Sequence, residues 1–589
     1  MSAPAPAREI DDQLTNDAEL ELRHGAPFVQ RPSWTAKLVA LCAIGAIGLV
    51  VVAPIVFMLT QSFNRAGLGK PFVFGLDAWQ TMLDSERTLK SLGYTLLLSL
   101  RVPIAVVLGA GIAWFLARTE NRLKRWVEYS LWLAFFMPTL PIVLGWIVLA
   151  DPRTGLVNNT LSYLPGGISL NIFSLQGIFW IHIMLTTVPV MTIFLSPSLR
   201  QMDVTLEESA QMSGAGSIQT LRHISLPLVK VALLAAGVIG FIRSLEVFEV
   251  ERVLGTPAGV DVYATRIYDQ IAADPPLFPE AMALGSLLLF TLLLLAGISQ
   301  FLTRRWGDFA TVGGRGVRMK SARSKLRDRV LMGAIVVFIG VGLYLPLAIV
   351  LLGSIRWRFG FFDIGYWTTE HWGETLADPA FLESLKNSAV VAFGAATIGL
   401  VCYAAIAWVI VSKRIPFTGA LTLICWLPWA VPGILLGFAW SSIILGTGLS
   451  GVVYGTLIPL LGVLIVKELP LGVQMLRTAM AQVSSELEES AVMAGANPQV
   501  VLRRILLPLV VPMLATVFVF TFMMALRDIS ATVMLATPGT RTLSVLLFEY
   551  TVAGSYETAA VIGLLMAGLA SLVALVALRT MRKHGLSGI

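Results

Sequence analysis

The chain has 589 residues, of which 56% are hydrophobic and only 13% are charged, and its formal net charge is +7. A soluble domain carries about a quarter charged residues, so this composition excludes an ordinary soluble enzyme or binding module and indicates an integral membrane protein. The positive charge does not predict a nucleic-acid partner, because the basic residues lie in loops beside apolar runs. The partner that this composition implies is the lipid bilayer.

The first part of the chain divides into a polar tail and six apolar runs. Residues 1–35 contain Ala, Pro and several acidic residues and lack the basic opening of a secretory signal, which predicts a disordered tail before an uncleaved first span. Residues 36–303 form the first repeat, with runs long enough to cross about 30 Å of hydrocarbon as helices. We place these runs at residues 38–60, 93–117, 127–150, 172–197, 228–243 and 281–302.

The second part repeats this organisation. Residues 304–329 form a basic linker, residues 330–581 form the second repeat, and residues 582–589 form a short C-terminal tail. The apolar runs of the second repeat lie at residues 330–353, 387–412, 419–445, 452–477, 509–525 and 560–579. Short cytoplasmic loops are enriched in Lys and Arg, so the basic linker and the basic clusters on its side predict that both termini are cytoplasmic. We therefore expect a multi-pass protein of the bacterial cytoplasmic (inner) membrane.

A polar stretch between the fourth and fifth runs returns between the tenth and eleventh. Residues 206–216 read LEESAQMSGAG and residues 487–497 read LEESAVMAGAN, with eight of eleven positions identical at an offset of 281. Further matches follow the same offset, and the second run matches the eighth at a longer offset. We therefore predict an all-α integral membrane protein with about twelve transmembrane helices, arranged as two parallel, pseudo-symmetric six-helix repeats.

Each copy of the polar stretch has the pattern of a helix, a glycine corner and a second helix, which we call an elbow. Glycine reaches the left-handed conformation of helix ends without steric cost, so Gly214 and Gly495 predict the two corners. The elbows lie in loops 201–227 and 482–508. Amphipathic helices on the membrane surface are the alternative interpretation. The close similarity of the two copies, between spans that have diverged, favours elbows that fit similar partners.

The elbows resemble a known motif. In the first copy it reads Glu208-Ser209-Ala210, then Gly214, then Ile-Ser-Leu-Pro ending at Pro227, and the second copy repeats it. This pattern resembles the cytoplasmic coupling motif of ABC-importer permeases of the binding-protein-dependent type, with Ser-Ala in place of the usual double Ala. The resemblance implies a type I ABC-importer permease fold. It assigns ATPase coupling to Glu207, Glu208, Ala210, Gly214, Pro227, Glu488, Glu489, Ala491, Gly495 and Pro508.

The resemblance also implies which partners the chain has. Each elbow would seat in a cleft of an ABC ATPase subunit, so two copies of that subunit are expected. The sequence has no G-x-x-x-x-G-K-[ST] phosphate loop, so the chain should be a transport subunit rather than an enzyme. ATP and Mg²⁺ would bind to the partner ATPase, with no cofactor in this chain. A substrate-binding protein outside the cytoplasm would deliver the cargo.

The cargo is open at this stage. Two elbows in one chain imply a fused permease, and such chains are most similar to the ferric-iron importer family, which implies ferric iron or a ferric chelate. Thiamine, polyamine and aminophosphonate importers are close relatives and supply alternative cargoes. A twelve-span secondary transporter is an alternative from another class, but its coupling would depend on intramembrane acids, and the spans carry few. A membrane scaffold without cargo is a further alternative.

One pair of charged residues lies near the middle of the tenth run. A charge there costs about 2.5–3.5 kcal/mol, so Lys467 and Glu468 are expected to face a cavity. Thr186 and Thr187 occupy the aligned positions in the first repeat. We predict that these four residues line the translocation path. A local ion pair that packs the bundle is the alternative.

A second charged set lies near the ends of the fifth and eleventh runs, which we place at the outer mouth. It consists of Glu246, Glu249, Glu251, Arg527 and Asp528. Hard cations prefer oxygen ligands, so these carboxylates would suit ferric iron. A salt-bridged rim or a dock for the binding protein is nevertheless the favoured interpretation. We interpret His182 as a hydrogen-bonded packing residue, and we assign no metal site.

Overall fold

The computed structural model describes most of the chain. The described residues are 34–163, 169–202, 204–306, 325–362, 365–412, 418–483, 487, 490–491 and 493–583. Nearly all of the tail expected at residues 1–35, residues 307–324 of the basic linker, and Glu488 and Glu489 of the second elbow lie outside the described residues.

The first repeat is built from helices, with short π-helical and 3-10 segments labelled η. In the described part of the chain the only β-pairing is two isolated bridges, Asn64 with Phe74 and Arg356 with Trp367. The elements of the first repeat are α2 (Trp34–Gln61), α3 (Asp77–Asp84), α4 (Glu86–Ser99), α5 (Arg101–Arg118), α6 (Lys124–Phe136), α7 (Thr139–Ala150), α8 (Leu156–Leu161), α9 (Leu175–Ile181), η1 (His182–Thr187), α10 (Val188–Gln201), α11 (Val204–Met212), α12 (Ser217–Thr220), η2 (Leu221–Ser225), α13 (Leu226–Ser244), η3 (Glu251–Gly255), η4 (Thr256–Ala258), α14 (Tyr263–Ile271) and α15 (Phe278–Trp306).

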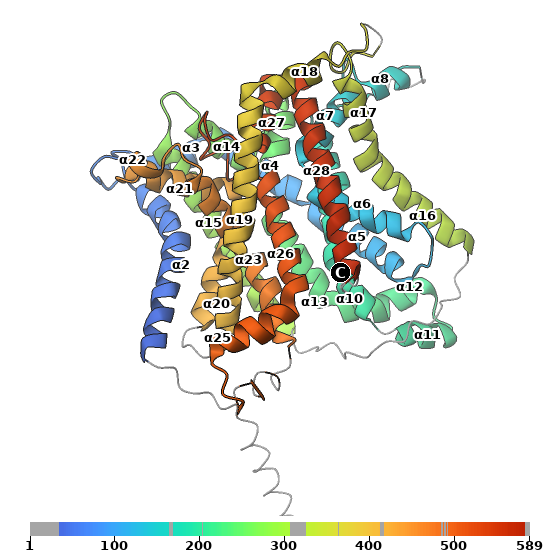
Figure 1. Ribbon diagram of the computed structural model, residues 1–589. Coiled ribbons are helices and arrows are strands. Elements are labelled where there is room, and N and C mark those ends of the chain that lie inside the picture. The colour runs from blue at the N-terminus through green and yellow to red at the C-terminus, as the bar shows by residue number, and fades with distance from the viewer. Residues whose placement is uncertain are drawn as a thin grey trace, which may run out of the picture.

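The second repeat follows the same order. Its elements are α16 (Lys325–Ile339), η5 (Gly340–Tyr344), α17 (Leu345–Ser354), α18 (Glu370–Ala377), α19 (Pro379–Ser412), α20 (Thr418–Trp426), η6 (Leu427–Ala430), α21 (Gly433–Gly446), α22 (Ser450–Val453), α23 (Ile458–Ala481), α25 (Pro498–Val501), η7 (Leu502–Leu506), α26 (Leu507–Arg527), α27 (Leu543–Ala553) and α28 (Tyr556–Lys583). Figure 1 shows these helices as one bundle, with both elbows at its lower end and α8 and α18 at its upper end. We call these the elbow end and the α18 end.

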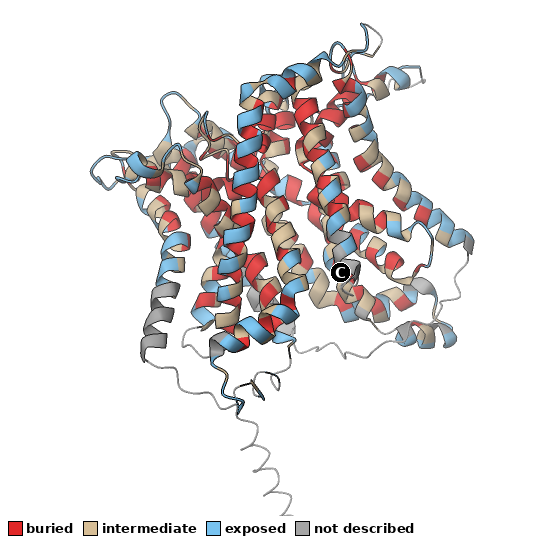
Figure 2. Cartoon of the chain, viewed as in Figure 1, coloured by how far each residue is buried: buried red, intermediate tan, exposed pale blue. Residues whose placement is uncertain are grey.

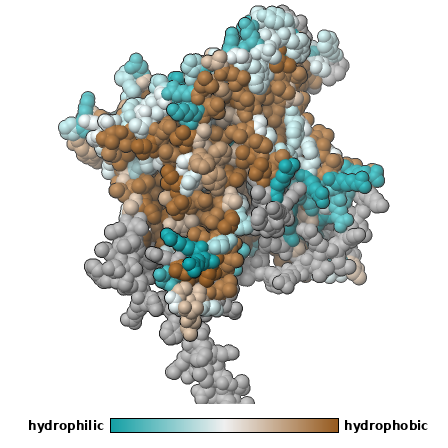
Figure 3. All heavy atoms as spheres, viewed as in Figure 1, coloured by the Kyte–Doolittle hydropathy of each residue, from teal (hydrophilic) through white to brown (hydrophobic). Residues whose placement is uncertain are grey.

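Ten helical stretches of the described chain are long and apolar enough to cross a membrane, and two bent helix pairs bring the number to twelve. This agrees with the expected twelve spans. In the cartoon of Figure 2, residues coloured as exposed lie mostly on the outer helices, and buried residues gather toward the centre of the bundle. On the face drawn in Figure 3, hydrophobic atoms dominate between hydrophilic patches at the two ends, as a lipid-facing belt requires.

The third and ninth spans are not the straight helices that the hydropathy predicts at residues 127–150 and 419–445. The chain bends by 101° between α6 and α7 and by 104° between Thr418–Trp429 and α21. Pro138 and Pro432 directly precede the second helix of each pair. Proline disfavours the helical conformation in the residue before it, and Met137 and Val431 are indeed extended, with ψ of 133° and 117°. Hydropathy alone misses this break because both arms are apolar.

The first span of each repeat packs against the bent span of the other repeat. Helix α2 packs against α21, and α17 packs against α7. The second contact is close because Gly145 has no side chain: a Cβ there would lie 2.3 Å from the carbonyl oxygen of Pro346. Helix α2 approaches Gly446, where an added Cβ would lie 2.7 Å from Cζ of Phe57. These two contacts between the repeats hold the halves of the bundle together.

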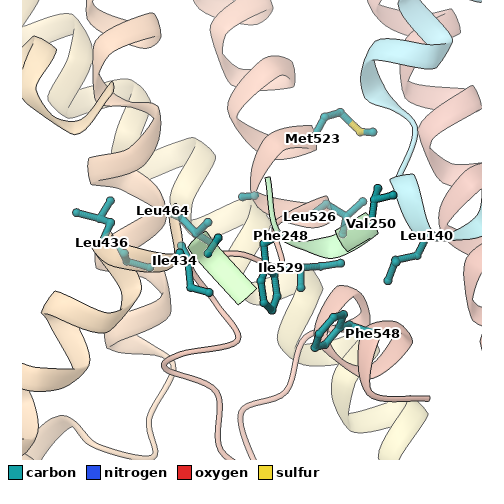
Figure 4. Close-up of a cluster of buried hydrophobic side chains, with 14 of the residues drawn as sticks. Leu140, Phe248, Val250, Ile434, Leu436, Leu464, Met523, Leu526, Ile529 and Phe548 are labelled. Atoms are coloured by element: carbon teal, nitrogen blue, oxygen red, sulfur yellow. The ribbon is translucent and has the colours of Figure 1, made fainter. Parts of the chain in front are cut away.

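A buried apolar cluster fills the space between the halves. Phe248 of the first repeat lies against Phe548 of the second, with ring centroids 5.4 Å apart (Figure 4). Both rings are only 2% exposed. Segments that follow α13 and α26 contribute these residues, so the chain turns back into the bundle after each of these helices. Helix α27, for example, packs against α19 and α28.

Candidate functional site

A cavity of about 320 Å³ lies between the two halves of the bundle, and charged side chains line much of it. Helices α13 and α26 both end at this cavity, because Arg243 lies in the last turn of α13 and Arg527 is the last residue of α26. The ionisable side chains that line it are Arg101, His182, Arg243, Glu246, Glu249, Glu251, Lys467, Glu468, Arg527 and Asp528.

The structure brings together the two sets that the sequence places apart. Thr186, Thr187, Lys467 and Glu468, expected along the path, line the same cavity as the five residues expected at an outer mouth. The reason is the return of the chain after α26: the Ser544 hydroxyl donates a hydrogen bond of 2.6 Å to the backbone oxygen of Asp528. This return holds the end of α26 within the bundle, so the second set lines the same cavity as the first, and its place at an outer mouth stays a prediction.

Several of the cavity charges are paired. The ammonium of Lys467 forms an ion pair with Asp528 and donates a hydrogen bond of 3.0 Å to Oγ of Ser530. Arg243 forms an ion pair of 2.9 Å with Glu246. The partner of Lys467 is therefore Asp528, and the local pair with Glu468 that the sequence left open is not formed.

His182 is buried and hydrogen-bonded, as predicted. Its Nε2 lies 2.7 Å from Oε1 of Glu251, and its Nδ1 lies 3.3 Å from Oγ1 of Thr186. His182 opens the π-helical segment η1, and Glu251 opens η3. Single π-helical turns inside α-helices are frequent at functional sites. Within the described residues, no group of three or more His, Cys, Asp or Glu side chains is placed to hold a metal ion.

Each repeat contributes one arginine whose side chain contacts the bent span of the other repeat. The guanidinium of Arg243 lies over the ring of Trp429, 5.3 Å from its centroid, and that of Arg527 lies over Phe135 at 5.7 Å. Arg527 also donates hydrogen bonds to the backbone oxygens of Phe135 and Met137, at 2.6 and 3.2 Å. Phe135 and Trp429 match in the repeat at the longer offset, so each repeat places an arginine over the equivalent aromatic residue of the other, although the two arginines themselves are not at matching positions.

Two arginines of the cavity are not among the site residues predicted from the sequence. Arg101 is 1% exposed, and its Nη1 donates a hydrogen bond of 2.8 Å to the backbone oxygen of Leu98. Arg243 is the other. Both lie in or beside apolar runs, and an ionisable residue at such a place is a signal of function that the sequence itself offers.

The first elbow is anchored to the second span through Glu207. Its carboxylate forms a bidentate pair with Arg118, with both N–O distances 2.7 Å, and accepts hydrogen bonds from Nε1 of Trp114 and the hydroxyl of Ser225. Burial alone would raise the pKa of Glu207, but the hydrogen bonds from Arg118 and Ser225 outweigh it and hold the pKa below its usual 4.5.

Glu207 therefore faces the body of the bundle, and its carboxylate is not presented to a partner. With only 4% of Glu207 exposed, its structural role is to hold the elbow in place. At the aligned positions of the second repeat, Ser412 replaces Arg118 and Leu506 replaces Ser225. Two members of the anchor are therefore not repeated in the second elbow, whereas Trp114 and Glu207 are matched there by Trp408 and Glu488.

Both elbows turn at their glycines with the same geometry. Gly214 has φ of 89° and Gly495 has φ of 83°, both left-handed as expected. The N–H of Ala215 closes the first corner by donating to the backbone oxygen of Ala210 at 3.0 Å, and the N–H of Ala496 donates to the backbone oxygen of Ala491 at 2.9 Å in the second. This is the bond of a Schellman motif.

The elbows present matching apolar side chains at their tips. Met212 is 90% exposed and Met493 is 88% exposed, and Leu206 and Leu487 are each about half exposed. Among the other predicted coupling residues, Glu208, Ala210 and Ala491 are half-buried, and Pro227 and Pro508 lie in the first turn of α13 and α26. The two copies thus offer equivalent surfaces at one end of the bundle.

The comparison with known families agrees with this arrangement. Residues 316–584 match the family described as binding-protein-dependent transport system inner membrane component. The matched region is the whole second repeat, and the first repeat copies its order of spans and its elbow. The second repeat is therefore similar to this family of inner-membrane components, and the chain, which carries two such repeats, is called the permease from here on. It is a multi-pass inner-membrane protein, as the sequence predicts.

Relatives of the permease include fused proteins of similar design. It is 27% identical to a ferric transport system permease protein of Actinobacillus pleuropneumoniae, over 78% of this chain and 66% of that protein. It is 22% identical to an Fe(3+)-transport system permease protein of Haemophilus influenzae, over 90% of this chain and 94% of that protein. A Salmonella typhi permease named for 2-aminoethylphosphonate transport is 27% identical, over 41% of this chain and 90% of that protein. The permease therefore spans just under two thirds of the first relative.

Proposed function

We propose that the permease is the translocation subunit of an ATP-driven importer, which takes a solute from an extracytoplasmic binding protein and releases it into the cytoplasm. The observation that carries this proposal is the pair of equivalent elbows at one end of a bundle whose two halves enclose a charged cavity. Alternating access needs two states of the halves around one site. A cavity lined by both halves is the place at which such a change would expose or release a solute.

Each elbow is proposed to seat in a cleft of one ABC ATPase subunit. Two copies of that subunit would bind ATP and Mg²⁺, and their closure would move the two halves through the elbows. The exposed Met212 and Met493 support this, because flexible, polarisable methionines suit a docking contact. On this proposal the elbow end is cytoplasmic, together with both termini, and the α18 end receives the binding protein.

The cargo proposed is ferric iron or a ferric chelate. The names of the fused relatives support it, and so do the five carboxylates of the cavity: Glu246, Glu249, Glu251, Glu468 and Asp528. Hard trivalent iron prefers oxygen ligands of this kind. An aminophosphonate is the second candidate, favoured by the Salmonella relative and by the four cationic side chains of the same cavity.

An ABC importer and a secondary transporter differ in the energy source that drives uptake. The test is uptake of radioactive iron into proteoliposomes that contain the permease, its ATPase and the loaded binding protein. We expect vanadate to abolish uptake and a protonophore to leave it unchanged. The reverse pattern would refute ATP-driven transport. Uptake of labelled 2-aminoethylphosphonate in place of iron would retain the mechanism and replace the cargo.

A further inference from the structure

The charges of the cavity are not evenly paired. Lys467 pairs with Asp528 and Arg243 with Glu246, while Arg101 and Arg527 donate to backbone oxygens. His182 pairs with Glu251. Two carboxylates are left over: within the described part of the chain, the structure gives Glu249 and Glu468 no hydrogen bond and no ion pair.

An unpaired carboxylate in this position is costly. Glu468 is 93% removed from solvent contact, since only 7% of it is exposed, yet it lines the cavity. Arg527 and Lys467 interact electrostatically with both acids but donate their hydrogen bonds to other groups, and a buried carboxylate without hydrogen bonds is costly unless a ligand supplies them. One oxygen of Glu251, which lines the same cavity, is also buried with no hydrogen-bond partner. The cavity therefore offers carboxylate oxygens to which no described residue donates a hydrogen bond.

Comparison of the two repeats indicates that the fold does not require these two acids. At the offset of 281, Glu468 matches Thr187 and Glu249 matches Ser530, so each acid has a neutral hydroxyl as its counterpart. The six-span unit is thus built in each half without one of the two acids. Each half contributes one acid, so a ligand held by both would bridge the halves.

We infer that Glu249 and Glu468 form a cation subsite at the interface of the halves, which takes a hydrated or chelated multivalent cation. The inference rests on the proposed transport function and names the cargo class of its cavity. The cation must bring part of its own shell, because no group of three or more potential ligands converges in the described residues. Carboxylate oxygens then complete that shell, and the bound charge compensates the two acids.

Terbium(III), a hard luminescent cation, is the probe for this subsite. Trp429 lines the cavity and can sensitise terbium emission. We expect saturable binding to the full-length permease in lipid nanodiscs, and a loss of affinity of about 10- to 100-fold in both Glu249→Gln and Glu468→Gln. Glu468→Asp keeps the charge and should retain most of the affinity. Glu383→Gln, at an exposed acid on α19, is the matched control and should bind as the wild type does.

The outcomes separate the subsite from the transport function. Unchanged terbium affinity in both Gln variants, or no binding by the wild type, would overturn the subsite even if vanadate-sensitive uptake persists. Inorganic phosphate bound in the cavity instead of terbium would also overturn it. Loss of affinity in correctly folded variants, shown by unchanged thermal unfolding and elution, supports it independently of uptake. Absence of ATP-driven uptake by the wild type would instead reject the proposed function.

Discussion

The guanidinium carbon of Arg527 lies 5.7 Å from the centre of the Phe135 ring, so the last residue of α26 contacts the bend between α6 and α7. The same arginine donates to two backbone oxygens that the bend leaves without helical partners. Arg243 and Trp429 form the reciprocal contact from the first repeat. Cation–π contacts strengthen when they are removed from water, so these contacts are a specific link between the halves.

Loss of the Arg527 link should destabilise the folded permease. In Arg527→Gln the backbone oxygens of Phe135 and Met137 lose a charged donor, which costs about 1–3 kcal/mol in the free energy of unfolding. Chemical denaturation in mild detergent measures this. Arg541→Gln is the control, because Arg541 pairs with Glu549 at a partly exposed position and its loss should cost less than about 1 kcal/mol. Equal losses in the two variants would contradict a special role for Arg527.

The corner glycine of the first elbow is required for its backbone conformation. A Cβ at Gly214 would meet nothing within 4 Å, but φ of 89° is strained for any β-branched residue. We expect Gly214→Val to insert and fold but to reduce stimulation of the ATPase by loaded binding protein, since about 1–2 kcal/mol favours another elbow conformation. Asparagine tolerates the left-handed region, so Gly214→Asn should keep most of the stimulation. Wild-type stimulation in Gly214→Val would refute the elbow model.

The anchor between Glu207 and Arg118 should be visible as protection of helix α11. Glu207→Gln leaves the nearly buried Arg118 without its countercharge, which costs about 3 kcal/mol locally or roughly a hundredfold in amide protection against hydrogen exchange. Glu208→Gln, one residue along the same helix, should change protection little. Protection of α11 in Glu207→Gln that equals the wild type would show that the anchor contributes nothing.

The same anchor predicts a pH dependence. The pKa of Glu207 lies below its usual 4.5 in the folded chain, so the ionised form is favoured by folding. Its contribution is therefore complete above about pH 4.5 and is lost as the pH falls through the lower folded value. The difference in α11 protection between the wild type and Glu207→Gln should shrink as the pH is lowered from 7 to below 4. A difference that grows at low pH would contradict this assignment.

The close approach of α7 and α17 predicts a sensitive glycine. Gly145→Ala places a methyl group against the backbone of Pro346, and overpacking of this kind costs about 1–3 kcal/mol. Gly333→Ala in α16 is the matched control, because a Cβ there meets nothing within 4 Å and alanine is the better helix former. Thermal unfolding in detergent should separate the two variants. Equal melting temperatures would show that the helices can separate at this contact without a loss of stability.

Local sequence was sufficient for the spans, the repeat and the elbows. Hydropathy depends on runs of neighbouring residues, and the corners depend on Gly214 and Gly495, whose lack of a side chain permits a left-handed turn wherever they are placed. The motif around them identified the permease class, while its transport residues remain predictions. These features are determined by interactions within a few residues along the chain.

Only the tertiary structure decided how the charges meet. Glu249 and Glu468 are 219 positions apart in the sequence, yet they line one cavity, because Glu249 lies where the chain returns into the bundle after α13 and Glu468 lies on α23. Lys467 forms its ion pair with Asp528 rather than with its neighbour Glu468, and Glu207 forms one with Arg118 rather than with an outside partner. Such pairings depend on the packing of segments that are distant in the sequence. Hydropathy cannot register them, because it averages along the chain whereas electrostatic pairing acts across space.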